Sequence, residues 1–405
     1  MIMNKKNQNS IKDTLKGIQV YTFTSNAHYK NQKDLLLVVF EECLNYAGVY
    51  TQSSCPSIPV SWCKQQLNKK KIRAILVNAG NANAFTGLRG ENDLKDLVGA
   101  VSKKISCKID EVAIASTGVI GEFLNTKPII EAISSMSEED VSSWHDAAES
   151  IMTTDTYPKI AYQTIKIDDE DVNIIGLAKG SGMIEPNMAT MLSFIFTDAN
   201  LSFDILNTIL KDVVRDSFNS ISVDGDTSTS DTVILVSTNA AQHELLTEEK
   251  DPRTKHLQET LQSIANDLAK KIVIDGEGAT KLVEINTISA VSKDSAMKIA
   301  KSIANSPLVK TALYGEDPNW GRIVGAIGKS FEKIDINRMR LFIGDFLVAY
   351  NGAVSEDYTE EDVKNYMRNK EILITVELNQ GKHAHRVWTC DLSHKYIDIN
   401  TDYRS

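Results

Sequence analysis

The chain has 405 residues, of which 42% are hydrophobic and 24% charged, and these values predict a soluble globular protein of two to three domains. Its formal net charge of −10 argues against a protein that binds nucleic acid by neutralising phosphates. The five cysteines include no CxxC pair, the N-terminal MIMNKKNQNS does not predict a signal peptide, and no apolar run is long enough to cross a bilayer. We therefore expect a cytoplasmic protein without a membrane anchor.

Predicted strands come first along the chain. Residues 74–77 and 112–115 are short apolar runs, and each leads into a turn-rich motif, NAGNANA and STG respectively. Residues 164–176 predict two strands around an acidic turn at 168–171. The apolar run 191–196 follows a glycine-containing loop and predicts a buried strand.

Helical spacing of apolar residues is clear at 205–213 and at 257–268. Ser292 is typical of an N-cap, so we expect a helix after it that Pro307 ends. There is no internal repeat. The chain predicts a mixed α/β or α+β fold whose sheets combine strands from distant segments, with a structural boundary near residues 285–310.

Several familiar signatures fail on close reading. The glycines after Lys179 do not complete a dinucleotide loop, and DGEGATK lacks P-loop spacing. DGDTSTSD lacks the glycine and the closing carboxylate of a calcium loop, and neither GxSxG nor HExxH occurs. His383 and His385 would share one face of a strand, where we expect exposed side chains and no metal site.

The segment KGSGMIEPNMATML places Thr190 where the flexible loop meets the buried strand. In one interpretation, Thr190 is an ordinary strand residue, because threonine favours strands. In the other, its hydroxyl attacks the carbonyl carbon of Ala189, and hydrolysis of the resulting ester leaves Thr190 as a new N-terminus. The free amine would then act as the general base for the hydroxyl, so that no histidine is needed.

A set of motifs decides between these interpretations. The chain contains KGSGMIEPNMATML, NAGNANA, STGVIGE, MTTDTYPK, SVDGDTSTSDT, DGEGATK, YGEDPNWGRI and a terminal YIDINTDYRS. Together they closely resemble, in order, the signatures of the ornithine acetyltransferase family, also called glutamate N-acetyltransferases of arginine biosynthesis. The resemblance spans residues 78–405 and favours self-cleavage before Thr190.

The resemblance implies a fold and an activity. The fold is α+β, a layered α/β/β/α sandwich similar to N-terminal nucleophile hydrolases but with different connectivity, with a smaller C-terminal α/β part. The reaction moves acetyl from N2-acetyl-L-ornithine to L-glutamate through an acetyl-threonine, without a metal or organic cofactor. Some members also accept acetyl-CoA, and the sequence does not decide this. An α chain of residues 1–189 and a β chain of residues 190–405 would stay associated, as an α2β2 heterotetramer.

The family's functional residues carry over by position. Thr190 matches the nucleophile, with cleavage between Ala189 and Thr190, and Thr117 with Gly118 matches the oxyanion hole. The substrate-binding positions match Thr153, Lys179, Thr190, Glu277, Asn400 and Ser405. Lys179 suits a substrate carboxylate and Glu277 a substrate ammonium, whereas sequence context alone favours a surface lysine and a turn carboxylate.

The chain also departs from the family pattern. Phe85 stands where a cysteine is usual, Ser405 replaces a commoner threonine, and the first seventy residues match poorly apart from residues 47–60. Two other functions remain open. One is a self-processing aminopeptidase of the related fold, which would pass the acyl group to water. The other is a relative that stays uncut and binds only a partner.

Overall fold

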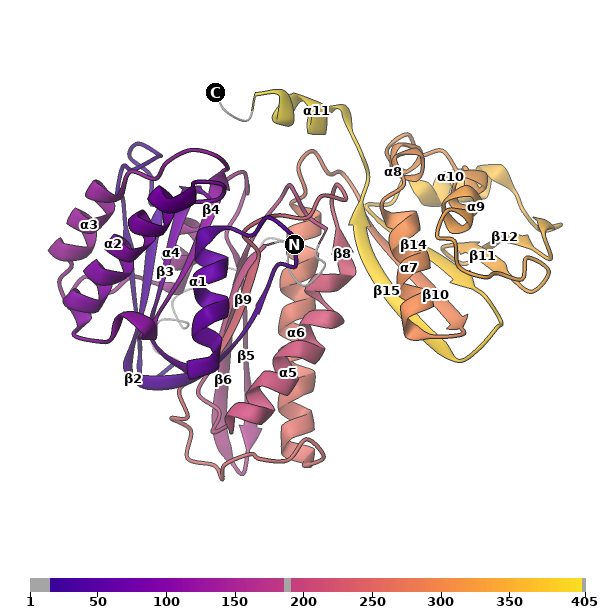
Figure 1. Ribbon diagram of the computed structural model, residues 1–405. Helices are drawn as coiled ribbons and strands as arrows, with labels where there is room; N and C mark the ends of the chain where they lie inside the picture. Colours follow the sequence, from indigo (N-terminus) through magenta and orange to yellow (C-terminus); the bar gives the residue numbers. More distant parts are fainter. Residues whose placement is uncertain (1–14, 186–190, 403–405) are drawn as a thin grey trace. The chain divides into compact units, whose positions relative to one another are not determined.

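The computed structural model describes residues 15–185 and 191–402, which form two compact units (Figure 1). Within these residues, unit 1 comprises the chain up to Gly180, residues 191–219 and Thr227–Ala269. Unit 2 comprises Ser181–Glu185, Ser220–Asp226 and the chain from Lys270 onward. The boundary expected near residues 285–310 therefore falls inside unit 2.

The strands of unit 1 form one sheet in the order β4-β3-β2-β9-β7-β6-β5, with β1 paired to β2. The pairs β3–β4 and β7–β9 are parallel, whereas β2 runs antiparallel to β1, β3 and β9, and β6 to β5 and β7. The strands are β1 (Ile18–Phe23), β2 (Leu35–Tyr50), β3 (Lys71–Asn81), β4 (Val112–Val119), β5 (Lys159–Ile167), β6 (Glu170–Lys179), β7 (Leu192–Thr197) and β9 (Thr232–Ser237).

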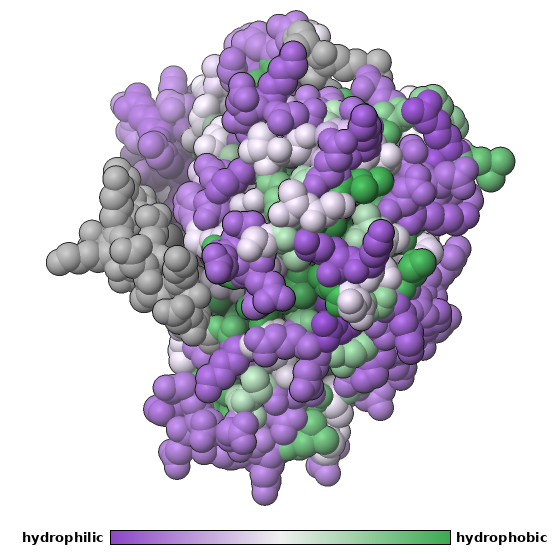
Figure 2. Space-filling view, turned by 90° about the vertical axis from the view of Figure 1, so that its left-hand side faces the viewer, coloured by the Kyte–Doolittle hydropathy of each residue, from purple (hydrophilic) through white to green (hydrophobic). Residues whose placement is uncertain are grey.

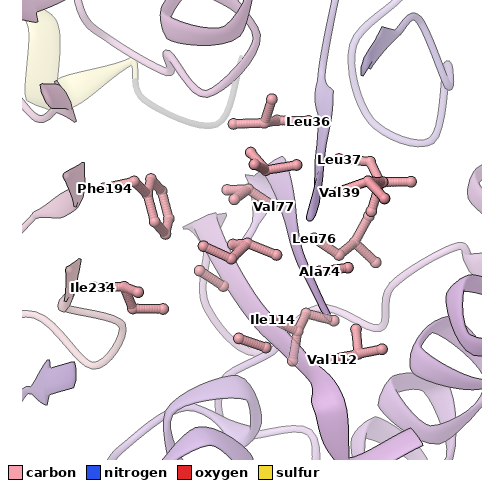
Figure 3. Close-up of a cluster of buried hydrophobic side chains, with 14 of the residues drawn as sticks. Leu36, Leu37, Val39, Ala74, Leu76, Val77, Val112, Ile114, Phe194 and Ile234 are labelled. Carbon is pink, nitrogen blue, oxygen red and sulfur yellow. The ribbon is translucent and has the colours of Figure 1, made fainter. Parts of the chain in front are cut away.

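The long strand β2 turns this sheet into two layers. Its first half pairs with β1 and β3, the register shifts between Val39 and Leu44, and its last residues pair with β9. The two halves of the sheet then face each other across a core of buried side chains. Figure 3 shows Phe194 and Ile234 on one side of this core, across from Leu36 and Val77. Exclusion of these apolar surfaces from water is the main force that holds the layers together.

Helices cover the outer faces of both layers. On one side α1 (Ile58–Gln66) and α2 (Gly87–Ile105) contact β4, and α3 (Thr126–Ser135) packs on α2. On the other side α5 (Phe203–Arg215) contacts β2 and β9, and α6 (Pro252–Ile274) meets β6, where Leu268 and Ile264 approach Gly176. The short α4 (Trp144–Ser150) contacts β1, β5 and β6. This layering confirms the expected α/β/β/α fold class.

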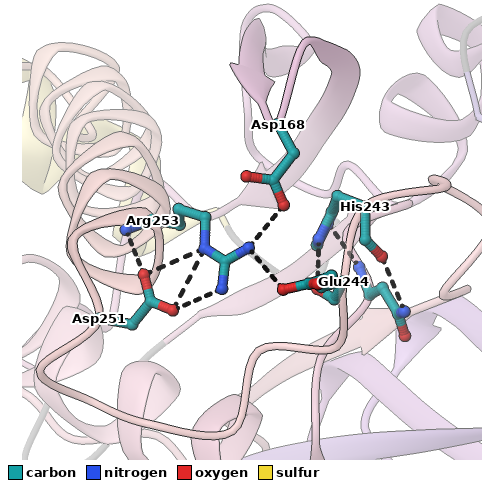
Figure 4. Close-up of polar contacts among 6 residues, drawn as sticks. Asp168, His243, Glu244, Asp251 and Arg253 are labelled. Carbon is teal, nitrogen blue, oxygen red and sulfur yellow. Dashed lines mark hydrogen bonds and ion pairs between the residues drawn. The ribbon is translucent and has the colours of Figure 1, made fainter.

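The predicted hairpin at residues 164–176 is formed by β5 and β6. Asp168 and Asp169 make the turn, both at positive φ (50° and 67°), as a two-residue hairpin loop requires. Arg253 near the start of α6 binds the turn, at 2.6 Å from Asp168, and also reaches Glu244 and Asp251 (Figure 4). The arginine thus ties the hairpin to the helix that covers β6.

Unit 2 has its own sheet, in the order β13-β12-β11-β14-β10-β15-β8, with β10–β14 and β15–β8 parallel. The helix α7 packs on β10 and β15 over a separate hydrophobic core. The elements are β8 (Ile221–Ser222), β10 (Leu282–Ala290), α7 (Lys293–Ala304), α8 (Pro307–Tyr314), α9 (Trp320–Gly328), β11 (Arg340–Ile343), β12 (Phe346–Tyr350), β13 (Ala353–Val354), α10 (Glu360–Met367), β14 (Glu371–Glu377), β15 (His383–Cys390) and α11 (His394–Thr401).

The start of the helix expected after Ser292 is confirmed, whereas its expected end is not. Ser292 caps α7 as expected, because its hydroxyl accepts a hydrogen bond from the backbone N–H of Ser295. The helix ends at Ala304, however, before Pro307, which instead occupies the first turn of α8. Proline suits that position because it has no N–H to leave unbonded.

The two histidines of β15 differ from each other. His383 is exposed as expected, but His385 is buried, with Nε2 at 2.9 Å from the Ser220 hydroxyl.

On the face shown in Figure 2, hydrophobic residues form small patches among hydrophilic ones. The exposed aromatic residues include Phe85, which departs from the resembled family and projects into solvent with 84% of its surface exposed. In the parts of the chain that the structure describes, no helix is long and apolar enough to span a membrane.

Candidate active site

In the sheet of unit 1, the ends of the neighbouring strands β6, β7, β9 and β2 lie in register with one another. Lys179 at the end of β6 pairs with Leu192 at the start of β7. Leu192 pairs with Thr232 at the start of β9, and Thr232 pairs with Tyr50 at the end of β2. Leu192 is two residues along the chain from Thr190. The sheet therefore places the end of β6, with its lysine, beside the strand that follows the predicted nucleophile.

The predicted oxyanion residues lie at the end of β4, which continues the parallel pairing with β3. Thr117 pairs with Ala79 and Gly118 with Gly80, and the register shifts between Gly80 and Asn81. The NAGNANA motif supports this turn through buried asparagines. Asn78 accepts a hydrogen bond from the Ser116 hydroxyl at 2.5 Å, and Asn81 donates to the carbonyl of Glu122 at 3.1 Å. These bonds hold the backbone around Thr117 and Gly118 in one conformation.

Gly118 cannot be replaced without strain. Its φ is +127°, and a Cβ atom would lie 2.2 Å from the carbonyl carbon of Gly80, which is backbone and cannot move aside. We expect Gly118→Ala to cost about 1–3 kcal/mol of unfolding free energy from backbone strain, with a further loss of activity. Gly99→Ala in α2 is the control, since its Cβ meets nothing within 4 Å and should stabilise the helix by about 0.5–1 kcal/mol. Urea unfolding of both variants measures the difference, and equal stabilities would contradict the argument.

Lys179 links the end of β6 to the end of β4. Its ammonium donates hydrogen bonds to the Thr153 hydroxyl at 2.6 Å and to the Thr117 hydroxyl at 3.2 Å. An ammonium can only donate, so both threonine oxygens act as acceptors. The hydroxyl proton of Thr117 is then directed away from Lys179 and can be donated to another acceptor. This arrangement suits a group that stabilises a developing oxyanion.

The buried carboxylate of Asp155 holds this lysine in place. Its Oδ2 lies 3.8 Å from Lys179 Nζ and accepts from the backbone N–H of Thr153 at 3.1 Å. Its Oδ1 accepts from Lys159 Nζ at 2.6 Å and from the N–H of Gly180 at 2.7 Å. Burial alone would raise the pKa of Asp155, but the charges of Lys179 and Lys159 and the bonds from Gly180 and Lys159 lower it to about 2. The carboxylate therefore stays ionised between its two lysines.

This pKa shift makes stability depend on pH. Because the pKa of Asp155 in the folded state lies below its unfolded value of 3.8, its contribution is complete above pH ~4. The contribution is lost as the pH falls from about 4 towards 2. We expect the urea midpoint of Asp155→Asn to fall less over this pH window than that of the wild type. Equal pH dependence in the two proteins would show that Asp155 titrates normally.

Two further predicted residues meet in unit 2. Glu277 of DGEGATK is buried, and its Oε2 accepts a hydrogen bond from the Asn400 side chain of α11 at 2.8 Å. Its backbone N–H donates to the carbonyl of Ser181 at 2.8 Å. Gly182 packs so closely on the Glu277 carboxylate that a Cβ atom there would lie 2.4 Å from it. Glu277 therefore lies in a turn, as sequence context predicts, and the side chain of Asn400 and the backbone of Ser181 and Gly182 fix its position.

The predicted site residues therefore form two groups, each within its own unit. Thr117, Gly118, Thr153 and Lys179 come together in unit 1, and Glu277 and Asn400 in unit 2. Ala189, Thr190 and Ser405 lie outside the described residues. Within those residues, no group of three or more His, Cys, Asp or Glu side chains could hold a metal ion.

Sequence reasoning missed Asp155 and Lys159. Both belong to the motif MTTDTYPK, in which Thr153 matches a substrate-binding position by resemblance. Their spacing of four residues gave no signal, because residues four apart face each other on helices, whereas Lys159 begins β5 and Asp155 lies in the loop before that strand. The contacts of Asp155 with Lys179 and Gly180 depend on the pairing of β5 with β6, which sequence alone does not fix.

Comparisons with known proteins place the chain in a family. The ArgJ family profile matches residues 21–405. "Arginine biosynthesis bifunctional protein ArgJ" from Bartonella henselae is 43% identical over 393 residues, covering 97% of this chain and 96% of the relative. The protein of the same name from Brucella melitensis is 45% identical over 393 residues, covering 96% and 95%.

A solved structure agrees with these relatives. The crystal structure of the ArgJ protein from Bacillus halodurans matches with a TM-score of 0.50 and 38% identity. The match covers 51% of this chain and 97% of the solved one, so the solved chain is about half as long. A profile match over nearly the whole length, with relatives of more than 40% identity along it, means that this chain belongs to the ArgJ family.

Proposed function

We propose that the protein is an acetyltransferase of arginine biosynthesis that moves acetyl from N2-acetyl-L-ornithine to L-glutamate through an acetyl-Thr190 intermediate. The relatives' shared name supports the pathway, and the word "bifunctional" in it favours acetyl-CoA as a second acetyl donor. The observation that carries the proposal is the pair of hydrogen bonds from Lys179 to the hydroxyls of Thr117 and Thr153. These bonds lie at the end of β6, next to the start of β7.

The nucleophile would arise by self-cleavage. The Thr190 hydroxyl attacks the carbonyl carbon of Ala189, the peptide bond becomes an ester, and water hydrolyses it. This leaves the carboxylate of Ala189 and the free amine of Thr190. The half-length chain of the solved relative supports cleavage, because division before Thr190 gives chains of 189 and 216 of the 405 residues.

Transfer then proceeds in two halves. The Thr190 amine takes the hydroxyl proton as Oγ attacks the acetyl carbonyl carbon, and Thr117 with Gly118 stabilises the oxyanion. Ornithine leaves with that proton on its amine. The amine of glutamate attacks the acetyl-threonine, the ester bond breaks, and N-acetylglutamate leaves with Thr190 restored.

Charged groups would select the substrates. Lys179, held by buried Asp155, is proposed to bind a substrate carboxylate, with the Thr153 hydroxyl beside it. Glu277 is proposed to bind a substrate ammonium, since Asn400 fixes one of its oxygens. Ser405 would complete this group by resemblance. No metal or organic cofactor takes part, and the chains are proposed to form α2β2 in the cytoplasm.

Initial-rate kinetics test the cycle. One site that serves two substrates in turn predicts ping-pong behaviour, so double-reciprocal lines for N2-acetyl-L-ornithine at several glutamate concentrations should be parallel. Intersecting lines would contradict the acetyl-threonine. Release of free acetate without glutamate would instead favour the self-processing hydrolase.

A further inference from the structure

The turn that carries Glu277 lies between α6 and β10, and the chain just after β15 binds it. Leu282 at the start of β10 pairs with Cys390 at the end of β15 in antiparallel register. Asp391 therefore lies beside the residues that lead from the turn into β10. All four residues belong to unit 2.

Asp391 is buried and binds this turn with both carboxylate oxygens. Its Oδ1 accepts hydrogen bonds from the backbone N–H of Thr280 at 2.8 Å and from that of Lys281 at 3.0 Å. Its Oδ2 accepts from the Thr280 hydroxyl at 2.5 Å. A carboxylate removed from water needs such donors to remain stable. The three bonds therefore fix the backbone of Thr280 and Lys281 relative to the end of β15.

The residues after Asp391 bind the same turn closer to Glu277. The Ser393 hydroxyl donates to the carbonyl of Gly278 at 2.6 Å. Gly278 has a φ of +71°, and a Cβ atom there would lie 2.6 Å from the backbone nitrogen of Tyr396. Glycine permits both this conformation and this close approach. The first turn of α11 thus rests directly on the glycine that follows Glu277.

The helix α11 then returns a side chain to Glu277. Asn400 Nδ2 donates to Glu277 Oε2 at 2.8 Å and to the carbonyl of Tyr396 at 3.0 Å. One amide nitrogen thus joins the carboxylate to the helix that rests on Gly278. The position of the Glu277 carboxylate consequently depends on how the chain after β15 is fixed to the turn.

The charge that Glu277 would bind is defined by the chemistry of the donor. N2-acetyl-L-ornithine has one free ammonium, at the end of its side chain, because its α-amine is acetylated. The amine of glutamate must be neutral to attack, so the donor's ammonium is the group that the Glu277 carboxylate suits. Such a charge-assisted bond depends on distance and direction. Displacement of the carboxylate by about 1 Å would therefore weaken the preference for a charged donor.

We propose that Asp391 is a positioning residue for donor selection, which fixes residues 278–281 and thereby the Glu277 carboxylate that binds the side-chain ammonium of N2-acetyl-L-ornithine. Ser393 acts in the same way through the carbonyl of Gly278. This inference rests on the proposed function, to which it adds a determinant of donor specificity.

The test compares two acetyl donors in the mature enzyme, N2-acetyl-L-ornithine and N2-acetyl-L-norvaline, which has the same carbon chain but no side-chain amine. With glutamate as acceptor, we expect the wild type to favour acetylornithine in kcat/KM by on the order of 10²-fold. Glu277→Gln should lose this preference. Asp391→Ala should reduce it by about tenfold, through a higher KM for acetylornithine at unchanged kcat, with little change for acetylnorvaline.

Three further variants separate positioning from charge. Asp391→Asn keeps a carbonyl oxygen for the two N–H groups and can donate to the Thr280 oxygen, so it should restore most of the preference. Equal losses in Asp391→Asn and Asp391→Ala would overturn the positioning role, because charge would then be the cause. Ser393→Ala removes the bond to Gly278 and should lower the preference in the same direction. Asp398→Asn, at an exposed position of α11, is the charge-matched control and should keep it.

Thermal unfolding of each mature variant monitors the fold. A fall in transfer from both donors by the same factor would reflect loss of folded enzyme and would overturn the positioning role. If Asp391→Ala yields no folded enzyme, the milder Ser393→Ala decides between the outcomes.

The remaining outcomes are distinct. Wild-type preference in Asp391→Ala and Ser393→Ala, together with its loss in Glu277→Gln, overturns this inference alone. A wild type that uses both donors equally, or a Glu277→Gln variant that keeps the preference, overturns the proposed role of Glu277 and this inference with it. A wild type that transfers no acetyl overturns the proposed function.

Discussion

Replacement of Thr190 by alanine is expected to leave one chain of 405 residues with no transfer of acetyl from N2-acetyl-L-ornithine to glutamate. The methyl side chain can neither attack the Ala189 carbonyl carbon nor carry an acetyl group. Loss of a catalytic nucleophile lowers kcat by about 10⁶-fold where it has been measured. The residual rate is measured with labelled acetylornithine, and chain length with a denaturing gel.

Thr190→Ser is the matched control. Serine keeps the hydroxyl and would present the same amine after cleavage, so we expect two chains and measurable transfer. Activity in an uncut Thr190→Ala protein would contradict the account, because the proposed base is the amine that cleavage creates. Loss of both cleavage and activity in Thr190→Ser would show that the methyl group of threonine is needed to orient the hydroxyl.

Replacement of Asp155 by asparagine is expected to lower the unfolding free energy by about 3–5 kcal/mol, because it leaves two buried ammonium groups without their carboxylate. The side chains of Asp155 and Lys159 are fully buried, and that of Lys179 is 9% exposed. The same change removes the ion pair between Asp155 and Lys179 that holds the lysine in place. If Lys179 binds the carboxylates of both substrates, KM should therefore rise for both. Urea unfolding in the uncut Thr190→Ala background measures the stability without the complication of two chains.

A double variant makes this prediction sharper. Asp155→Asn with Lys159→Met removes both charges of the closest pair, and neutral replacement of a buried pair costs less than loss of one partner. We therefore expect the double variant to be more stable than Asp155→Asn alone, although Lys179 remains misplaced and KM remains high. A double variant less stable than the single one would mean that Lys159 stabilises the fold through other contacts.

Features that depend on neighbouring residues could be predicted from the sequence. The hairpin around Asp168 and Asp169 and the capped start of α7 at Ser292 are of this kind, since turn and cap preferences act within a few residues. The buried strand β7 is another, because a short apolar run after a loop leaves few alternatives.

Features that depend on sheet pairing could not be predicted. The bond from Lys179 to Thr117 spans 62 residues, and it exists because β2 folds the sheet so that the ends of β4 and β6 meet. The role of Asp155 is hidden for the same reason. The boundary expected near residues 285–310 falls inside unit 2, which also takes in Ser181–Glu185 and Ser220–Asp226.

The family resemblance supplies the roles of the site residues, and the structure supplies the contacts that hold them. Resemblance assigned Thr153 and Lys179 to substrate binding, and the structure adds the carboxylate of Asp155 that holds the lysine. Resemblance assigned Glu277 and Asn400, and the structure adds their mutual hydrogen bond. The prediction for Thr190 itself rests on the sequence and on the relatives, because that residue lies outside the described part of the chain.

The most direct test of the central claim is the denaturing mass of the purified protein after incubation with N2-acetyl-L-ornithine alone. The account predicts two chains of 189 and 216 residues, with the longer one beginning at Thr190 and heavier by one acetyl group, which added glutamate removes. A single chain of 405 residues, or two chains that never gain an acetyl group, would contradict it.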